Sequence, residues 1–238
     1  MKLTLSTLFT LFLVSLSTVV FSQEENTEKT DKEDWVNLLA DDSFDQWRST
    51  KKDKTEAYTP IGTRWEINDG VMSLDRSREG TGKHIETKKN YFNFELKFEF
   101  NIKHNCNSGI KYRCKNAVGF EFQIMDDANY KDNKVTHRTG EIYELAAEQT
   151  PRIVKPAGEW NTGRIIANNN TIEHWLNGKK VCTIEYGGDD WQKRFEKSKY
   201  FKKGTLDFGT HQGPIHIQDH SDTDIEIKNL FIREIKTH

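Results

Sequence analysis

The chain has 238 residues, of which 34% are hydrophobic and 30% charged, and its formal net charge is −2. This near-neutral balance argues against a nucleic-acid partner, which would require a basic patch or stripe. The length from residue 35 to 238 suits one all-β domain, because sandwiches of about 200–250 residues routinely form a single unit.

The first residues have the pattern of a secretory signal peptide. Lys2 precedes an unbroken run of apolar and hydroxyl side chains over 3–21, which the small residue Ser22 closes. Serine and threonine interrupt the run and charged residues follow at once, so no membrane-spanning helix is expected. We therefore expect residues 1–23 to be removed on export, giving a periplasmic or secreted protein. The polar residues 24–34 predict a solvated leader.

Alternation of apolar and polar residues dominates the remaining chain. Every second residue of 92–100 is apolar, and this period of two predicts a strand with one buried face. Asn177-Gly178 between two apolar runs predicts a tight hairpin. Similar strand-like runs occur at 65–67, 71–74, 109–113, 120–125, 165–166, 172–176, 181–186, 215–218 and 225–235.

One segment breaks this pattern. In 190–199, Trp191 and Phe195 lie four residues apart, which predicts a short helix capped by Asp189 or Asp190. Many strands, hairpin turns and little helical periodicity together predict an all-β fold. We expect an antiparallel two-sheet jelly-roll sandwich with one short helix, spanning 35–238.

The three cysteines are an odd set for an exported chain. Cys106 and Cys114 flank a predicted strand, and eight extended residues span roughly 26 Å. That separation exceeds the roughly 7 Å Cα distance that a disulfide tolerates. Because Cys182 has no evident partner either, we expect all three thiols to be free.

Strand parity gathers polar side chains on one side of the predicted sheet. If Phe120, Phe122 and Ile124 face the core, Glu121 and Gln123 face away from it. Alternation alone favours a solvated surface for such groups and ordinary surface ion pairs for charged ones. By the same count the outward set includes Gly109, Lys111, Arg113, His216, Gln218 and, if the strand continues, His220.

Several short phrases in this chain occur together in a known family. They are Asn107-Ser108-Gly109-Ile110 with Arg113, Gly119-Phe120-Glu121-Phe122-Gln123, Thr139-Gly140 with Tyr143, Lys155-Pro156, Gly158-Glu159-Trp160-Asn161, Trp175-Leu176-Asn177-Gly178, Ser198-Lys199 and Gln218-Asp219-His220. In order and spacing they resemble the 3-keto-disaccharide hydrolase family over essentially the whole chain after the leader. Departures from the family pattern occur at Lys111, Glu141, Glu144 and Ser221.

The resemblance implies a concanavalin-like jelly roll that cleaves glycosides whose carbon-3 hydroxyl has been oxidised to a ketone. Such a ketone acidifies the hydrogen on carbon 2, so a base can remove it and the oxygen on carbon 1 can leave by β-elimination. Hydration of the resulting enone gives net hydrolysis. This path needs a base, a group that stabilises the enolate, and an acid.

The resemblance assigns roles to residues around one expected cleft. Glu121 and His220 are the candidate catalytic residues, and either is a candidate base. Arg113 and Lys155 are the candidate cations for the enolate oxygen. Trp175 is expected in the core. The other expected substrate contacts are Gln123, Tyr143, Gln218 and, at the edge of the cleft, Trp160.

A divalent metal is an alternative stabiliser of the enolate. Glu121, His220 and Asp126 have suitable ligand types, but no tight ligand spacing is present, so the sequence leaves the cofactor open. The rival functions are a non-catalytic carbohydrate-binding module and a structural cell-surface sandwich, because the fold hosts all three. Convergence of a base and a cation in one place distinguishes the enzyme. The expected partner is a carbohydrate, and no sequence signal specifies an oligomeric state.

Overall fold

The computed structural model describes residues 34–50, 57–115, 118–132, 134–146, 153–205, 207–220 and 222–236. The predicted signal peptide 1–23 and all but the last residue of the predicted leader lie outside the described residues. Within the ranges given, no helix is long and apolar enough to cross a membrane. The chain from Trp35 onward forms one compact unit.

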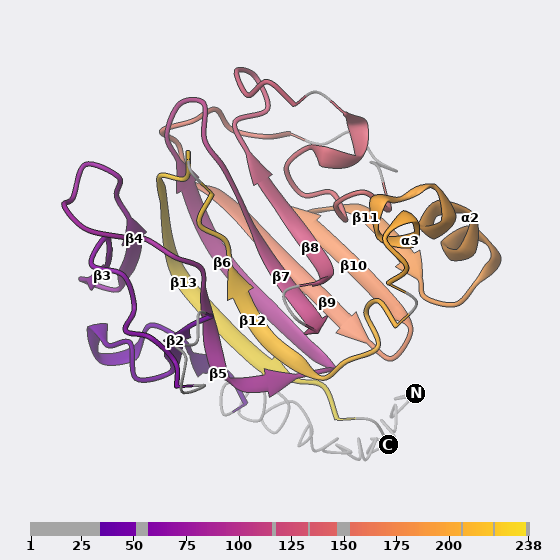
Figure 1. Ribbon diagram of the computed structural model, residues 1–238, viewed down its shortest axis with the longest axis horizontal. Helices are drawn as coiled ribbons and strands as arrows, with labels where there is room; N and C mark the ends of the chain where they lie inside the picture. The colour runs from indigo at the N-terminus through magenta and orange to yellow at the C-terminus, as the bar shows by residue number, and fades with distance from the viewer. Residues whose placement is uncertain are drawn as a thin grey trace, which may run out of the picture. The chain divides into compact units, whose positions relative to one another are not determined.

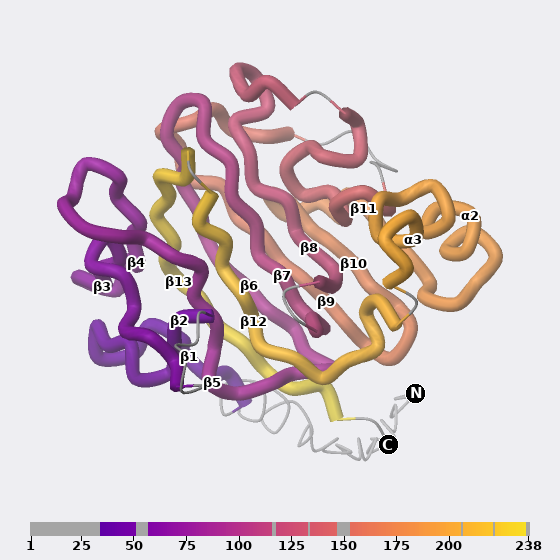
Figure 2. Tube along the Cα trace, viewed as in Figure 1, coloured from indigo at the N-terminus to yellow at the C-terminus, as the bar shows by residue number. Residues whose placement is uncertain are grey.

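Two antiparallel sheets pack face to face, as Figure 1 and the trace in Figure 2 show. This arrangement confirms the expected all-β jelly-roll sandwich. The eight-stranded sheet has the order β11 (Lys179–Glu185), β10 (Thr171–Leu176), β9 (Asn161–Asn168), β6 (Phe94–Ile102), β13 (Ile225–Glu234), β4 (Val71–Leu74) and β3 (Trp65–Asn68), with β1 (Val36–Asn37) against β13. The five-stranded sheet has the order β2 (Trp47–Ser49), β5 (Ile85–Tyr91), β12 (Gly213–Ile217), β7 (Asn107–Lys115) and β8 (Val118–Met125).

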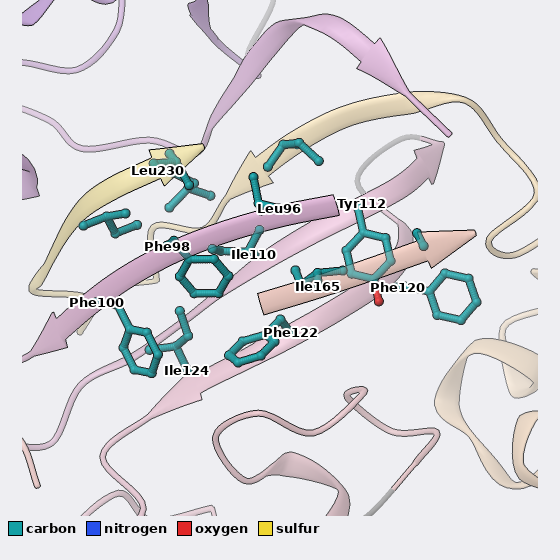
Figure 3. Packing of buried hydrophobic residues seen from close by; sticks show 14 of the residues in the cluster. Leu96, Phe98, Phe100, Ile110, Tyr112, Phe120, Phe122, Ile124, Ile165 and Leu230 are labelled. Atoms are coloured by element: carbon teal, nitrogen blue, oxygen red, sulfur yellow. The ribbon is translucent and has the colours of Figure 1, made fainter. Parts of the chain in front are cut away.

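The core lies between the two sheets and is rich in phenylalanine. Phe98 of β6 meets Phe122 of β8 edge to face, with 5.2 Å between ring centroids. Figure 3 shows these rings together with Phe100, Phe120 and Ile124 in the space between the sheets. Burying each such side chain contributes about 1.5–3 kcal/mol to stability, so the apolar residues that alternate inward hold the two sheets together.

The predicted hairpin and helix are both present. Asn177 and Gly178 have φ values of 49° and 78°, which is the left-handed pair that a two-residue hairpin between β10 and β11 requires. Helix α2 (Asp189–Lys197) buries Trp191 and Phe195, whose rings stack at an interplanar angle of 12°. Its N-cap is Gly188, so the expected capping by an aspartate is wrong.

Several short elements and one longer strand have no clear signal in the sequence. Strand β5 alternates in burial only over 85–87, and the next three residues, 88–90, are all exposed, so its pairing with β2 and β12 defines it. The short helix α3 (Lys199–Lys202) follows α2 at once, because the Ser198 hydroxyl accepts a bond from the Phe201 N–H at 3.3 Å. Two 3-10 turns complete the described elements: η1 (Ala40–Asp42) and η2 (Val135–His137).

The cysteines agree with the prediction. Cys106, Cys114 and Cys182 are all free and buried. Cys106 directly precedes the extended strand β7 and Cys114 lies near its end, which keeps the two thiols apart.

A bulge at the end of β7 overturns the expectation for one site residue. The pairing of β7 with β8 shifts register there, and Arg113 has a φ of 49°. A bulge breaks the two-residue period, so Arg113 does not share the face of Lys111. Its guanidinium is buried and donates to Phe92 O at 2.9 Å, Asn169 O at 2.7 Å and Asn93 Oδ1 at 3.1 Å. Arg113 therefore ties loops together.

Candidate active site

A row of polar and charged side chains crosses the outer face of the five-stranded sheet. The register pairs Arg48 with Glu86, Glu86 with His216, His216 with Lys111, and Lys111 with Glu121. The neighbouring residues on each of β12, β7 and β8 are apolar and buried, so these side chains point away from the core. We call this set the Glu121 row.

The carboxylate of Glu121 is buried at the end of this row. Only 3% of the residue is exposed, although it lies on the outer face. Lys111 Nζ lies 3.7 Å from Glu121 Oε2. Burial raises the pKa of Glu121, and the cations of Lys111 and Lys199 oppose that rise. The site thus combines a carboxylate of raised basicity with two ammonium groups.

Gly109 leaves the space in which two polar side chains meet. A Cβ atom at this position would lie 2.5 Å from Glu121 Oε1 and 3.0 Å from Gln218 Oε1. The carboxylate and the carboxamide therefore converge over the backbone of β7. His220 Nε2 lies 3.1 Å from the same Gln218 oxygen, so that ring nitrogen carries the proton.

Three histidines gather beside Gln218. The ring centroid of His84 lies 5.1 Å from that of His216 and 6.4 Å from that of His220. His84 Nδ1 accepts a bond from the Asp219 N–H at 2.8 Å. Burial lowers the pKa of each histidine, that of His216 to about 3. At neutral pH these rings therefore act as uncharged hydrogen-bonding groups.

The segment 139–146 runs along β8 and brings Tyr143 to Glu121. The Tyr143 N–H donates to Glu121 O at 3.1 Å. Lys199 Nζ donates to the Tyr143 hydroxyl at 3.1 Å and lies 4.1 Å from the centre of its ring. Burial lowers the pKa of Lys199, while burial and the Glu121 charge raise that of Tyr143. Tyr143 is therefore protonated at neutral pH.

A buried histidine supports Tyr143 from behind. The His137 ring stacks on the Tyr143 ring, with 4.1 Å between centroids. Its two nitrogens are held by carboxylates, Nδ1 by Asp132 at 2.6 Å and Nε2 by Glu144 at 2.9 Å. Glu144 also accepts from the Lys199 N–H at 3.2 Å. This network fixes both members of the Tyr143–Lys199 pair.

The structure brings together part of the predicted site. Glu121, Gln123, Gln218 and His220 lie on or beside one face, and Tyr143 lies next to Glu121. Gln123 Nε2 donates to Asn107 Oδ1 at 2.7 Å, which holds the amide in place.

Lys155 and Trp160 do not join this face. Lys155 Nζ donates to Trp160 O at 2.9 Å, and Lys155 lines a separate hollow of about 150 Å³ near Asp126. The Trp160 ring lies beneath Lys228 Nζ of β13, 4.1 Å from its centroid, in the other sheet. The expectation that Lys155 and Arg113 supply the cations is therefore wrong.

Trp175 is not in the core as expected. His174 and Leu176, its neighbours on β10, are buried, so Trp175 points to the outer face of the eight-stranded sheet. Arg164 and Lys180 flank its ring, at 5.2 and 5.8 Å from the centroid.

Most of the surrounding groups are not among the predicted site residues. Lys111 and His216 were placed on the correct face by parity, but neither was given a role. Lys199 was part of a family phrase only. His84 and His137 lie in segments without periodicity, where no pattern could have singled them out.

The anticipated metal ligands do not assemble. Asp126 caps the turn after β8, where its carboxylate accepts bonds from the Asn105 N–H at 2.8 Å and from Asn129 Nδ2 at 2.9 Å. Across the described ranges, no three His, Cys, Asp or Glu side chains are arranged to hold a metal ion. Glu121, His220 and Asp126 therefore do not fit a shared metal.

Comparison with known proteins places the chain in a family. A family model described as the 3-keto-alpha-glucoside-1,2-lyase-like domain matches residues 34–233. A 3-keto-disaccharide hydrolase of Bacteroides thetaiotaomicron is 24% identical over 237 residues, covering 85% of this chain and 79% of the relative.

Solved structures share the fold. A candidate glycosyl hydrolase of Parabacteroides distasonis superposes with a TM-score of 0.74 at 27% identity, covering 88% of this chain and 97% of that one. A second such protein of the same organism gives a TM-score of 0.59 at 24% identity, covering 84% and 99%. Because this family model matches nearly the whole described unit, the chain belongs to the 3-keto-α-glucoside-1,2-lyase-like family.

Proposed function

We propose that this protein is an enzyme that cleaves the glycosidic bond of glycosides carrying a ketone at carbon 3. The observation that carries the proposal is the buried Glu121 carboxylate with Lys111 and Lys199 beside it. A carboxylate whose pKa is raised by burial, with cations and the Tyr143 hydroxyl nearby, is an arrangement suited to proton abstraction. The family description, which names a 1,2-lyase of 3-keto-α-glucosides, supports the same chemistry.

The reaction proceeds by elimination. A base takes the proton from carbon 2, and the electron pair of that C–H bond forms an enolate with the carbon-3 ketone. The enolate then collapses, the ketone re-forms, a double bond forms between carbons 1 and 2, and the bond from carbon 1 to the glycosidic oxygen breaks. The departing oxygen takes a proton. Addition of water to the resulting enone completes a net hydrolysis.

Glu121 is the base in this proposal. Burial raises the pKa of Glu121, which makes its carboxylate a stronger base than an exposed one. The nearby Lys111 ammonium favours the ionised form that accepts a proton. His220, whose imidazole is neutral because burial lowers its pKa, lies on the far side of Gln218 and is the alternative base.

Lys111 stabilises the enolate oxygen. The carbon-2 hydrogen and the carbon-3 oxygen belong to adjacent carbons, so the base and the cation must lie side by side. The separation of 3.7 Å between Glu121 Oε2 and Lys111 Nζ meets that requirement. A donor aimed at a developing oxyanion typically contributes about 10²- to 10³-fold to the rate.

Tyr143 and His220 are the two candidate proton donors for the departing oxygen. The Tyr143 hydroxyl accepts a bond from Lys199, so its own proton is available to a substrate. His220 carries its proton on Nε2, next to Gln218. Comparing Tyr143→Phe with His220→Gln identifies the donor, because only its loss slows substrates with poor leaving groups more than substrates with good ones.

We also propose that the enzyme acts outside the cytoplasm. The apolar and hydroxyl run over 3–21, followed by Ser22 and polar residues, supports export. Mass spectrometry of the protein recovered from an exporting host should find a chain that begins near Gln23. Recovery of an uncleaved chain from the cytoplasm would contradict this proposal.

The substrate class is tested by a matched pair of glucosides. Methyl 3-keto-α-glucoside and methyl α-glucoside differ only in the oxidation state of carbon 3. We expect release of methanol from the ketone alone, followed by NMR. Cleavage of the unoxidised glucoside at a similar rate would contradict the elimination chemistry. Binding of both sugars without cleavage of either would favour a carbohydrate-binding module.

A further inference from the structure

A second hollow lies on the outer face of the eight-stranded sheet, on the opposite side of the sandwich from Glu121. Its volume is about 390 Å³, which is within the range of roughly 300–1,000 Å³ typical of small-ligand pockets. The residues that line it include Lys97, Glu99, Arg164, Trp175, Asn229 and Phe231.

Aromatic and cationic side chains form a row across the floor of this hollow. The register pairs Trp175 of β10 with Arg164 of β9, Arg164 with Lys97 of β6, and Lys97 with Phe231 of β13. An aromatic ring thus stands at each end of the row and two cations lie between them. We call these four residues the Trp175 row.

The backbone gives the hollow its shape. Strand β13 bulges between Lys228 and Phe231, where Asn229 has a φ of 49°. At the other end, the turn residue Gly178 has no atom within 4 Å of where a Cβ would lie. Asn229 Nδ2 donates to Glu99 Oε1 at 2.6 Å, which supplies a polar rim. A bulge beside an open hairpin leaves the row accessible from solvent.

Positive charges outnumber negative ones around Glu95, at the floor of the hollow. The buried Glu95 carboxylate accepts bonds from Arg164 Nε at 2.6 Å and Arg233 Nε at 3.0 Å, and Lys97 Nζ lies 3.7 Å away. Three cations therefore share one carboxylate, and Lys97 Nζ also lies over the Trp35 ring at 4.3 Å. Glu95 offsets only one of these three positive charges, so the charge that remains would attract an anion bound beside Lys97 and Arg164.

The Trp175 ring is held in place for stacking. Its Nε1–H donates to Glu173 Oε2 at 2.9 Å. The Arg164 guanidinium carbon lies 5.2 Å from the ring centroid, so the ring and the cation form one continuous surface. An aromatic ring beside a cation suits a pyranose that carries an acidic group, because the apolar face of the sugar stacks while the acid pairs with the cation.

We propose that this hollow binds an acidic sugar. The sugar ring stacks on Trp175, and its carboxylate lies between Arg164 and Lys97. The site is separate from the Glu121 row, and its occupancy does not depend on whether the chain cleaves 3-keto-glycosides.

The test uses the full chain labelled with 5-fluorotryptophan, which gives each of the six tryptophans its own ¹⁹F signal. The Trp175 signal is identified by its loss in Trp175→Phe. Cellobiouronic acid and cellobiose are the probes, since they differ only by a carboxylate in place of a hydroxymethyl group. We expect cellobiouronic acid to shift the Trp175 signal, and cellobiose to bind about tenfold more weakly, as loss of one charged contact implies.

Variants separate this site from the proposed catalytic one. Arg164→Gln should weaken binding of cellobiouronic acid about tenfold, whereas Glu121→Gln and Tyr58→Ala should leave it unchanged. Tyr58 is a matched control, because it is an exposed ring under an arginine, Arg48, on the other sheet. An unmoved Trp175 signal or equal binding of the two sugars would overturn the proposal. A Trp175 signal that moves with protein concentration alone would overturn it too, because a second copy would then occupy the face.

Discussion

The two outer faces of the sandwich are built from the same alternation, yet they place charge in different environments. In the Glu121 row, the Lys111 side chain is only 17% exposed and its partner Glu121 is buried. In the Trp175 row, Lys97 is 51% exposed although its partner Glu95 is just as buried. On the first face, segment 139–146 bonds to the backbone of β8 beside Glu121, and Lys199 at the start of α3 lies near the Glu121 carboxylate. Alternation decides which side chains leave the core, and neighbouring segments decide which of those side chains are shielded from solvent.

The largest effect should follow loss of the Lys111 cation from the Glu121 row. Lys111→Met keeps the stem but removes the ammonium group, so turnover of a 3-keto-glucoside should fall about 10²- to 10³-fold. Lys97→Met makes the same change on the exposed face and should leave turnover unchanged. Steady-state kinetics on both variants measures the contrast. Equal turnover in the two variants would mean that covering Lys111 has no catalytic consequence.

The network behind Tyr143 should matter more for stability than an exposed ion pair. His137→Ala removes two charged hydrogen bonds and leaves Glu144 without that partner, so the free energy of unfolding should fall by about 2–4 kcal/mol. His104→Ala is the control, because His104 pairs with Asp126 at 3.5 Å but is largely exposed. That variant should lose less than about 1 kcal/mol. Urea unfolding measures the loss of free energy in both variants, and similar losses would contradict this prediction.

A smaller effect is expected at Gly109, where the Glu121 row leaves no space for a larger side chain. Gly109→Ala would place a methyl group 2.5 Å from Glu121 Oε1, so the carboxylate must shift and turnover should fall about tenfold. Gly188→Ala meets its nearest atom at 3.4 Å and should leave kinetics unchanged. Wild-type turnover in Gly109→Ala would show that the position of this carboxylate is not critical.

The smallest expected effect is the dependence of stability on pH. Burial raises the pKa of Glu121 above its ordinary 4.5, so between those two values the folded state binds more protons than the unfolded state. The free energy of unfolding contributed by this group therefore falls as pH rises through that window. Glu121→Gln has no proton to lose, so its stability relative to wild type should increase with pH across it. A constant difference in thermal midpoint from below pH 4.5 to neutrality would contradict the raised pKa.

Strand parity predicted the face of Glu121, Gln123 and Gln218 because β8 and β12 keep a strict period of two against a buried sheet. It failed for Arg113, where a bulge with positive φ adds a residue out of step. Trp175 was misplaced because its bulk was given more weight than its parity. In a strand of a two-sheet sandwich, a large aromatic residue points away from the core when both of its neighbours in the strand point into it.

The loop groups of the site could not have been predicted in the same way. His137 and Glu144 meet because the segment after β8 folds back along that strand, and this path is set by backbone bonds such as Gly140 N–H to Gln123 O at 2.8 Å. Local sequence carries no period that encodes such a path. His84 likewise joins His216 and His220 only through the pairing of β5 with β12.

The role of Glu121 is tested most directly by the fate of the carbon-2 hydrogen. Methyl 3-keto-α-glucoside carrying deuterium at carbon 2 is compared with the unlabelled sugar, in wild type and in Glu121→Gln. We expect a primary isotope effect on kcat/KM for the wild type, and a loss of turnover of roughly 10²- to 10⁴-fold in the variant with binding retained. Cleavage by Glu121→Gln at the wild-type rate, with the same isotope effect, would show that another group takes the proton.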